Sequence, residues 1–201
     1  LDRLRSMQLE DYVSVGNDDS YCYWLEFKTA ELVGIGGGSA YKFGVFKRNK
    51  PKSVPQDSIY ATDNIYAWVK RYGTTAEEAF GTMKSGLIEV AGAAVRGNLA
   101  AVASVNLPPM LLWKTAFLYQ DHERPIVAPI FLEAALKFLA FGDPAARRSV
   151  AEAHETLLSR KPEKQDIFAF GSAEWDRWKS FQGSLSGLIA SDGLPWKDEL
   201  I

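Results

Sequence analysis

Cations and aromatic rings occur together in one short stretch of the N-terminal half. Five lysines and arginines fall within residues 42–52 without a single acid, and three aromatic residues stand beside them: Lys42, Lys47, Arg48, Lys50, Lys52, Tyr41, Phe43 and Phe46. Basic side chains bind phosphates, and aromatic faces stack on exposed bases. The stretch therefore favours a nucleic-acid surface. A hairpin that ends in a solvated lysine-rich loop is the alternative, because charge runs usually mark wet surface.

A second segment of the same kind follows further along the chain. Residues 40–48 and residues 64–72 both alternate in the manner of strands. The candidate phosphate-binding residues of the two segments are Lys42, Lys47, Arg48, Lys50, Lys70 and Arg71. The candidate base-stacking residues are Tyr41, Phe43, Phe46, Tyr66 and Trp68.

A glycine-rich loop precedes the first segment and contains Gly36, Gly37, Gly38 and Ser39. A Walker A loop needs Gly-Lys-Ser/Thr before a helix, and a dinucleotide-binding loop needs a third glycine where Ser39 stands, so the loop fits neither motif. Its backbone N–H groups would still be able to hold one anion. A flexible or tightly packed turn explains the glycines more simply.

The triplet Glu26-Phe27-Lys28 resembles the end of the metal-dependent nuclease motif, in which carboxylates bind Mg²⁺ and a lysine polarises water. The motif needs a strand, whereas this segment is better explained as a helix that begins at Ser20, so a salt-bridged surface pair is the simpler interpretation. His122 and His154 lack metal-ligand spacing, and we expect His154 on the polar side of its helix. We therefore expect a non-catalytic module with no metal site and no cofactor.

The composition indicates a folded protein without a general basic field. The chain has 201 residues, of which 47% are hydrophobic, and its net charge is −2. Any contact with nucleic acid must therefore be local. Cys22 is the single cysteine, and no long apolar stretch or signal peptide is present, so we expect a cytoplasmic protein that does not bind a membrane.

The order of the expected elements predicts an α+β fold. The two strand segments and a capped helix over residues 75–97 predict a small antiparallel sheet with a packed helix. Short strands are expected at 115–119 and 126–131, and helices at 132–141, 145–159 and 166–188. We expect an α+β DNA-recognition module over residues 1–141 and a helical subdomain over residues 142–201 that leads to a linker or another domain, with one continuous domain as the alternative.

Several blocks of the sequence resemble a region that precedes the AAA+ motor in McrB-like restriction proteins. These blocks are DDSYCYWLEFKTAELVGIGGGSAYKFGVFKR, YAWVKRYGTTAEEAF, LPPMLLWKTAFLYQ and KPEKQDIFAFG. The resemblance implies a region that recognises DNA, often with a modified base, next to a motor in the same polypeptide that hydrolyses GTP or ATP. It also implies a partner nuclease subunit that cuts the DNA.

Three functions follow from the sequence. The first is a DNA-recognition module of a restriction, or phage-defence, system, which would use the basic and aromatic residues above, with a modified base as one candidate target. The second is an assembly module that links the motor to the nuclease partner. The third is a Mg²⁺-dependent nuclease that uses Glu26 and Lys28.

Overall fold

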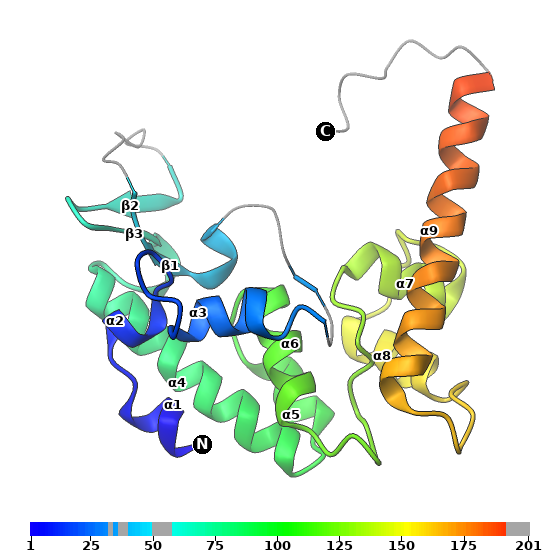
Figure 1. Cartoon of the computed structure of the whole chain (residues 1–201), viewed down its shortest axis with the longest axis horizontal. Coiled ribbons are helices and arrows are strands. Elements are labelled where there is room, and N and C mark those ends of the chain that lie inside the picture. Colours follow the sequence, from blue (N-terminus) through cyan, green and yellow to red (C-terminus); the bar gives the residue numbers. More distant parts are fainter. Residues whose placement is uncertain (32–33, 36–39, 50–57, 192–201) are drawn as a thin grey trace.

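The computed structural model describes residues 1–31, 34–35, 40–49 and 58–191, and only the backbone of 185–191. The described chain has the α+β architecture that the sequence predicts. A small antiparallel sheet lies at one end of the molecule, and the C-terminal helices lie at the other (Figure 1). A long helix, α4, runs beneath the sheet and the N-terminal helices (Figure 1).

Short helical segments form the N-terminal part of the fold. These are α1 (Asp2–Ser6), α2 (Leu9–Tyr12), α3 (Tyr21–Tyr23) and the π-helix η1 (Trp24–Lys28). The Ser20 hydroxyl accepts a hydrogen bond from the Tyr23 N–H at 3.2 Å and begins α3, as the sequence predicts. The following turns are π-helical and end at Lys28, so the predicted helix is shorter and less regular than expected.

The sheet is three-stranded in the described chain, with the order β1-β3-β2. Its strands are β1 (Val45–Lys47), β2 (Tyr60–Thr62) and β3 (Tyr66–Val69). The predicted first strand was wrong over its first half, because residues 40–43 form the 3₁₀ helix η2 (Ala40–Phe43). Gly44, with a φ of +77°, separates this helix from β1 in a conformation that a side chain would strain. A second 3₁₀ helix, η3 (Lys70–Tyr72), ends the other predicted strand.

Helix α4 (Ala76–Val95) is the element that the sequence predicted best. Thr75 accepts a hydrogen bond from the Glu78 N–H at 3.1 Å and caps its N-terminus. One face of α4 is fully buried and packs against β1, β3 and the helix α6. The opposite, exposed face carries the polar residues, as the periodic pattern indicated.

The expected strands at 115–119 and 126–131 were wrong. Helix α5 (Leu99–Ser104) is followed by α6 (Pro109–Tyr119), in which residues 111–117 are all buried. A helix that is buried on every side lacks an apolar stripe, so its pattern does not distinguish it from a buried strand. Residues 126–131 have no strand partner. Instead, the Gln120 side chain accepts hydrogen bonds from the Ile126 and Val127 N–H groups at 2.9 and 2.8 Å.

The C-terminal part consists of α7 (Glu133–Phe141), α8 (Val150–Leu158) and α9 (Ile167–Ser191). Helix α7 packs against both α8 and α9, so the expected boundary after residue 141 would separate α7 from the helices it contacts. The buried hydrophobic side chains form one continuous core from Leu4 to Trp178. Within the described residues, no helix has the length and apolar character required to span a membrane.

Candidate nucleic-acid interface

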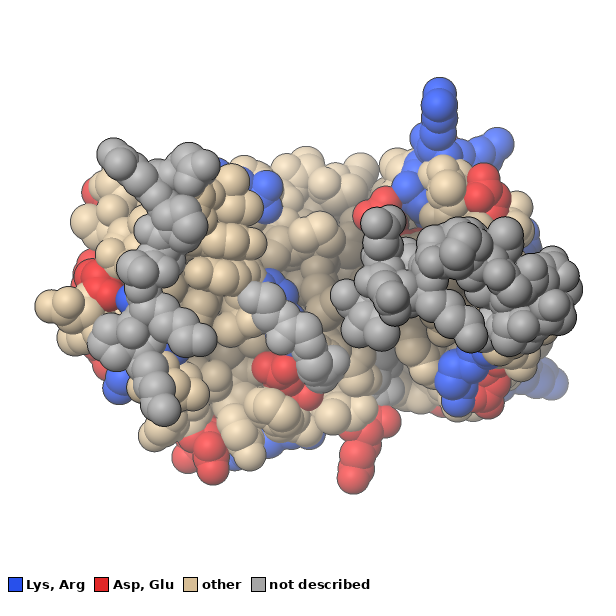
Figure 2. Space-filling view, turned by 90° about the horizontal axis from the view of Figure 1, so that it is seen from above, with Lys and Arg blue, Asp and Glu red and all other residues tan. Residues whose placement is uncertain are grey.

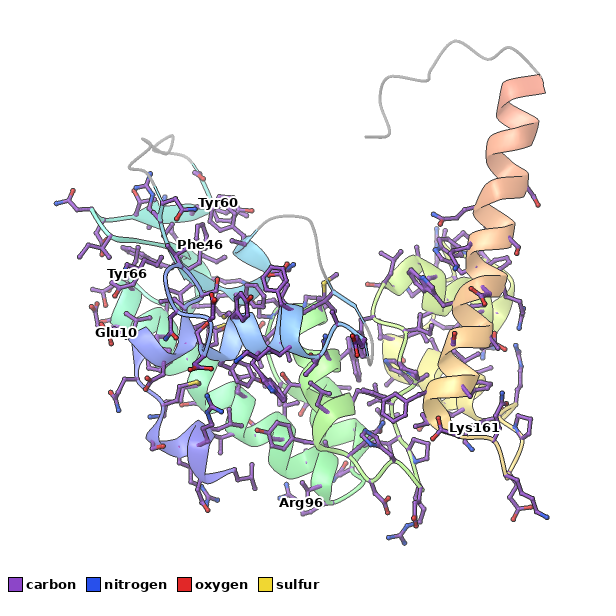
Figure 3. All side chains as sticks on the ribbon, viewed as in Figure 1. Glu10, Phe46, Tyr60, Tyr66, Arg96 and Lys161 are labelled. Carbon is purple, nitrogen blue, oxygen red and sulfur yellow. The ribbon has the colours of Figure 1, made fainter. Side chains whose placement is uncertain are left out.

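The register of the sheet decides which predicted residues reach its surface. Val45 is paired with Trp68, and Phe46 is paired with Ala67. Paired residues of antiparallel strands point to the same face. Val45 is fully buried and Trp68 is 5% exposed, so their face is the one that covers the core. Phe46 therefore points to the opposite, outer face of the sheet (Figure 3).

Three aromatic rings meet on this outer face, and we call Tyr41, Phe46 and Tyr60 the aromatic triad. The Tyr41 and Tyr60 rings are stacked, with centroids 3.4 Å apart and planes at 19°. Phe46 meets Tyr41 edge to face, with the centroids 4.8 Å apart. All three side chains are partly exposed. The triad is therefore a preformed, partly exposed aromatic cluster, in which Tyr41 and Tyr60 also pack against the core.

The end of η2 holds Tyr41 in position. The buried Tyr12 hydroxyl donates to the Phe43 carbonyl at 2.5 Å, and the Gly44 N–H donates to the Tyr41 carbonyl at 3.0 Å. At Gly44, a side chain would also collide with Met83 on α4. The close packing of this turn against α4 fixes the direction in which Tyr41 leaves the backbone.

The described cations of this part of the chain are not all on the face of the triad: Arg48 shares the face of Phe46, whereas Lys47, which is paired with Tyr66, lies on the opposite face. Residues 40–72 contain seven lysines and arginines and two acids, although the whole chain carries a net charge of −2. Arg48 follows Phe46 on the outer face and donates to the Asp63 carbonyl at 3.2 Å. Burial raises the pKa of the Tyr41 hydroxyl and Tyr60 adds to this, while the positive charge of Arg48 opposes it. Lys47, Lys70 and Arg71 are exposed.

The described residues of the face seen in Figure 2 carry charges of both signs. Basic and acidic side chains lie at separate places among uncharged residues, and the described atoms form no continuous basic field. Any binding to phosphates must therefore depend on a few local contacts.

Three of the predicted base-stacking residues are structural. Phe43, Tyr66 and Trp68 are 3%, 8% and 5% exposed. The Trp68 indole N–H donates to the Gly73 carbonyl at 3.0 Å, and the Tyr66 hydroxyl donates to Glu10 at 3.3 Å (Figure 3). The prediction was wrong for these rings, because Phe43 lies on the 3₁₀ helix η2, and because alternation does not reveal which face of a strand is buried at Tyr66 and Trp68.

Lys42 was also assigned to the wrong role. Its ammonium lies 2.6 Å from a Glu26 carboxylate oxygen and donates to the Ile35 carbonyl at 2.8 Å. The side chains of Lys42 and Glu26 are only 12% and 14% exposed. This ion pair binds η2 to η1, so Lys42 serves the fold rather than a phosphate. Lys50, Gly36, Gly37, Gly38 and Ser39 lie outside the described residues.

Lys114 on α6 is a buried charged residue that the sequence reasoning missed. It is fully buried and donates to the Thr29 carbonyl at 3.4 Å. Burial lowers the pKa of its amine to about 8, and Glu26 opposes that shift. A lysine in the middle of the apolar run LLWKTAFLY was the available signal. Glu26, Lys42 and Lys114 together form a buried charge cluster between η1, η2 and α6.

The nuclease alternative does not fit this cluster. Glu26 lies on a π-helix rather than a strand, and its carboxylate is engaged by Lys42. Lys28 pairs instead with Asp19, at 2.7 Å. Among the described residues, no three His, Cys, Asp or Glu side chains gather to form a metal site. Glu26 and Lys28 therefore do not form the arrangement that the nuclease motif requires.

His154 is buried, contrary to the expected polar position. It is fully inaccessible, its Nδ1 accepts a hydrogen bond from the Ala128 N–H at 3.2 Å, and its ring lies 4.7 Å from that of Trp113. Its Nε2 atom has no hydrogen-bond partner. Burial lowers the pKa of His154 to about 3, so the ring is neutral near pH 7. His154 is a core residue that links α8 to the segment after α6.

The fold and the surface together define a small α+β protein with a partly exposed aromatic triad on the outer face of its sheet. Comparison with known proteins adds no relative, since no family model, no curated protein and no solved structure matches the chain.

Proposed function

We propose that this chain is a DNA-recognition module of a restriction assembly, and that it binds DNA through the aromatic triad and the neighbouring cations. The observation that carries the proposal is the triad itself. Three partly exposed rings are held together on the sheet face opposite the one that covers the core, in the most basic part of an acidic chain. The resemblance to McrB-like proteins supports the restriction context, in which a motor in the same polypeptide and a nuclease subunit would be the partners.

The chemistry of the triad suits bases that have left the double helix. Stacking on an aromatic side chain is worth about 1–3 kcal/mol per base, and it requires an exposed ring face. Tyr41 and Tyr60 already cover one face of each other, so the triad offers room for few bases. We therefore expect a preference for single-stranded or flipped bases over an intact duplex, in which the bases remain stacked.

Fluorescence anisotropy with labelled single-stranded and double-stranded DNA tests the proposal at about 50 and 200 mM salt. Phe46→Ala is expected to weaken binding by roughly 5- to 100-fold, which corresponds to the loss of one stacking ring. Trp175→Ala is the matched control, because Trp175 is 39% exposed on α9, away from the sheet. This variant should bind as the unchanged protein does.

Arg48→Ala tests the electrostatic part of the same surface. The loss of one phosphate contact should weaken binding at low salt and reduce the salt slope by about 1. Arg147→Ala, at an exposed position between α7 and α8, is the control. If the unchanged chain binds neither form of DNA at the lower salt, the proposal fails and an assembly role becomes the better explanation.

A further inference from the structure

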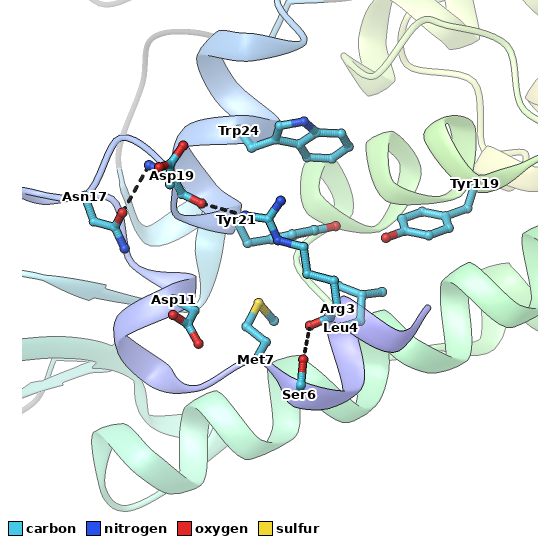
Figure 4. A pocket seen from close by; sticks show the side chains of 10 residues that line it. All are labelled: Arg3, Leu4, Ser6, Met7, Asp11, Asn17, Asp19, Tyr21, Trp24 and Tyr119. Atoms are coloured by element: carbon cyan, nitrogen blue, oxygen red, sulfur yellow. Dashed lines mark hydrogen bonds between the residues drawn. The ribbon is translucent and has the colours of Figure 1, made fainter.

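A cavity of about 420 Å³ lies between α1, α3 and α6, outside the sheet surface (Figure 4). Its floor is apolar and consists of Leu4, Met7 and Tyr21, all of which are buried. Two further rings, Trp24 and Tyr119, form its walls. The polar rim contains Arg3, Ser6, Asp11, Asn17 and Asp19. This volume lies within the usual range for small-molecule sites, and an apolar interior with a few polar groups is typical of them.

The aromatic part of the cavity is held rigidly. The Tyr21 ring is stacked near Tyr12, with centroids 6.0 Å apart and planes at 13°, and its hydroxyl forms a 2.8 Å hydrogen bond with Thr115. The Trp24 ring lies 6.0 Å from that of Tyr21. Tyr119 stands on the opposite side, and its hydroxyl points into the cavity (Figure 4). A flat ligand would therefore meet aromatic walls that are already in place.

The charges of the rim largely cancel. Arg3 donates to the Asp19 carbonyl at 3.0 Å, and the Asp19 carboxylate pairs with Lys28 at 2.7 Å. One oxygen of Asp11 accepts a hydrogen bond from the Gln8 N–H at 2.9 Å. The lining residues thus carry one cation, Arg3, and two carboxylates, while Lys28 pairs with Asp19 from outside the lining. The lining has no excess positive charge, and Asp11 disfavours an anion beside it.

Several polar atoms at the cavity have no hydrogen-bond partner among the described residues. They are the second carboxylate oxygen of Asp11, the indole N–H of Trp24 and the hydroxyl of Tyr119. Burial raises the pKa of the Tyr119 hydroxyl, so this group keeps its proton and donates. The cavity therefore offers one acceptor, on the exposed residue Asp11, and one donor, the Tyr119 hydroxyl, beside flat aromatic surfaces.

We propose that this cavity binds a nucleobase that carries an exocyclic amino group. The base would stack against the Trp24 ring, its amino group would donate to Asp11, and its ring nitrogen or carbonyl oxygen would accept from Tyr119. A free nucleoside or a base of a nucleic-acid strand would supply the same chemistry. The 5′-phosphate of a bound nucleotide would lie beside Asp11 and Asp19, so a nucleoside should bind more tightly than its 5′-monophosphate.

Isothermal titration of the full chain with adenosine, cytidine, guanosine and uridine tests this proposal. Cytidine should bind at least about fivefold more tightly than uridine, because uridine places a carbonyl where the amino group would face Asp11. Cytidine 5′-monophosphate should bind more weakly than cytidine. If a single-stranded oligonucleotide competes with cytidine, the cavity also accepts a base that belongs to a strand. If the oligonucleotide does not compete, the cavity accepts only the free nucleoside.

Variants of the cavity connect any binding to this site. Tyr119→Phe removes only the hydroxyl and should weaken cytidine binding by about 3- to 10-fold. Asp11→Asn should remove the preference for cytidine over uridine, since the amide can also donate. Trp24→Leu should weaken all nucleosides by about tenfold or more. Tyr23→Phe and Phe46→Ala, at residues that do not line the cavity, are the controls and should change none of these affinities.

Three results would overturn the proposal. These are the absence of nucleoside binding at millimolar concentration, equal affinity for cytidine and uridine, and unchanged binding in both Tyr119→Phe and Asp11→Asn. Because Phe46 belongs to the aromatic triad and not to the cavity, loss of DNA binding in Phe46→Ala with intact nucleoside binding would separate the two sites.

Discussion

Because of His154, lowering the pH should destabilise this protein already in a pH range above the one in which carboxylates titrate. Its folded pKa is about 3, whereas the ordinary value is 6.5. Between these values the unfolded chain binds a proton that the folded chain does not, so the free energy of unfolding falls as pH falls. One pKa unit corresponds to about 1.36 kcal/mol, and the loss between pH 7 and pH 5 is therefore about 2 kcal/mol.

Urea unfolding, followed by circular dichroism at pH 7, 6 and 5, measures this loss directly. His154→Gln removes the ionisable ring and retains an acceptor for the Ala128 N–H, so its free energy of unfolding should change little across this range. His122→Gln is the matched control and should keep the slope of the unchanged protein, because His154 is still present. Equal slopes in His154→Gln and the unchanged protein would refute the argument that a buried neutral imidazole controls the acid sensitivity.

Three further substitutions test the packing of the fold. Lys114→Met should raise the free energy of unfolding at pH 7 by roughly 1–3 kcal/mol, because the lowered pKa of Lys114 means that its charged amine is disfavoured in the folded state, while Lys42 still pairs with Glu26. This gain should shrink as pH rises from about 8 toward 10.5, where the folded Lys114 is already neutral, and urea titrations at pH 7 and 10 would show it. Gly44→Ala should lower the melting temperature more than Gly16→Ala, since both glycines have positive φ but only Gly44 faces a side chain, that of Met83. Arg160→Met should cost about 1–2 kcal/mol in urea unfolding, because Arg160 donates to two carbonyls at the end of α7.

Local sequence signals predicted the elements that have one buried face and one exposed face. Helix α4 has one buried face and a capping residue, Thr75, and both signals are visible in the sequence. Helix α6 is buried on all sides, so the periodic signal is absent and a strand was expected over its last five residues, 115–119. Strand β2 has only three residues, all half-buried, and it forms because β3 pairs with it. Such long-range pairing has no local signature.

The aromatic triad was predicted only in part, because one of its members is brought into place by long-range strand pairing. Tyr41 and Phe46 were identified from their place among cations, but Tyr60 joins them only through the pairing of β2 with β3. Trp68 has the same local pattern as Phe46 yet faces the core. Helix α4 determines which face of the strand is buried. The residues next to the strand in the sequence do not reveal which face this is.

The cavity could not be predicted from local patterns at all. Leu4, Trp24 and Tyr119 come from α1, η1 and α6, and Tyr119 was expected to lie on a strand. The buried charge cluster has the same character, because Lys114 meets Glu26 only when α6 packs beside η1. Sites assembled from distant segments require the fold before their chemistry can be recognised.

Photo-crosslinking tests the central claim, that the aromatic triad contacts DNA, most directly. A single-stranded oligonucleotide with 5-iodouracil would be irradiated with the full chain, and the crosslinked peptide identified by mass spectrometry. Contact through stacking predicts crosslinks at Tyr41, Phe46 or Tyr60 that are lost in Phe46→Ala and kept in Trp175→Ala. Crosslinks confined to α9 or to the α1–α3–α6 cavity, or the absence of any crosslink at low salt, would contradict the claim.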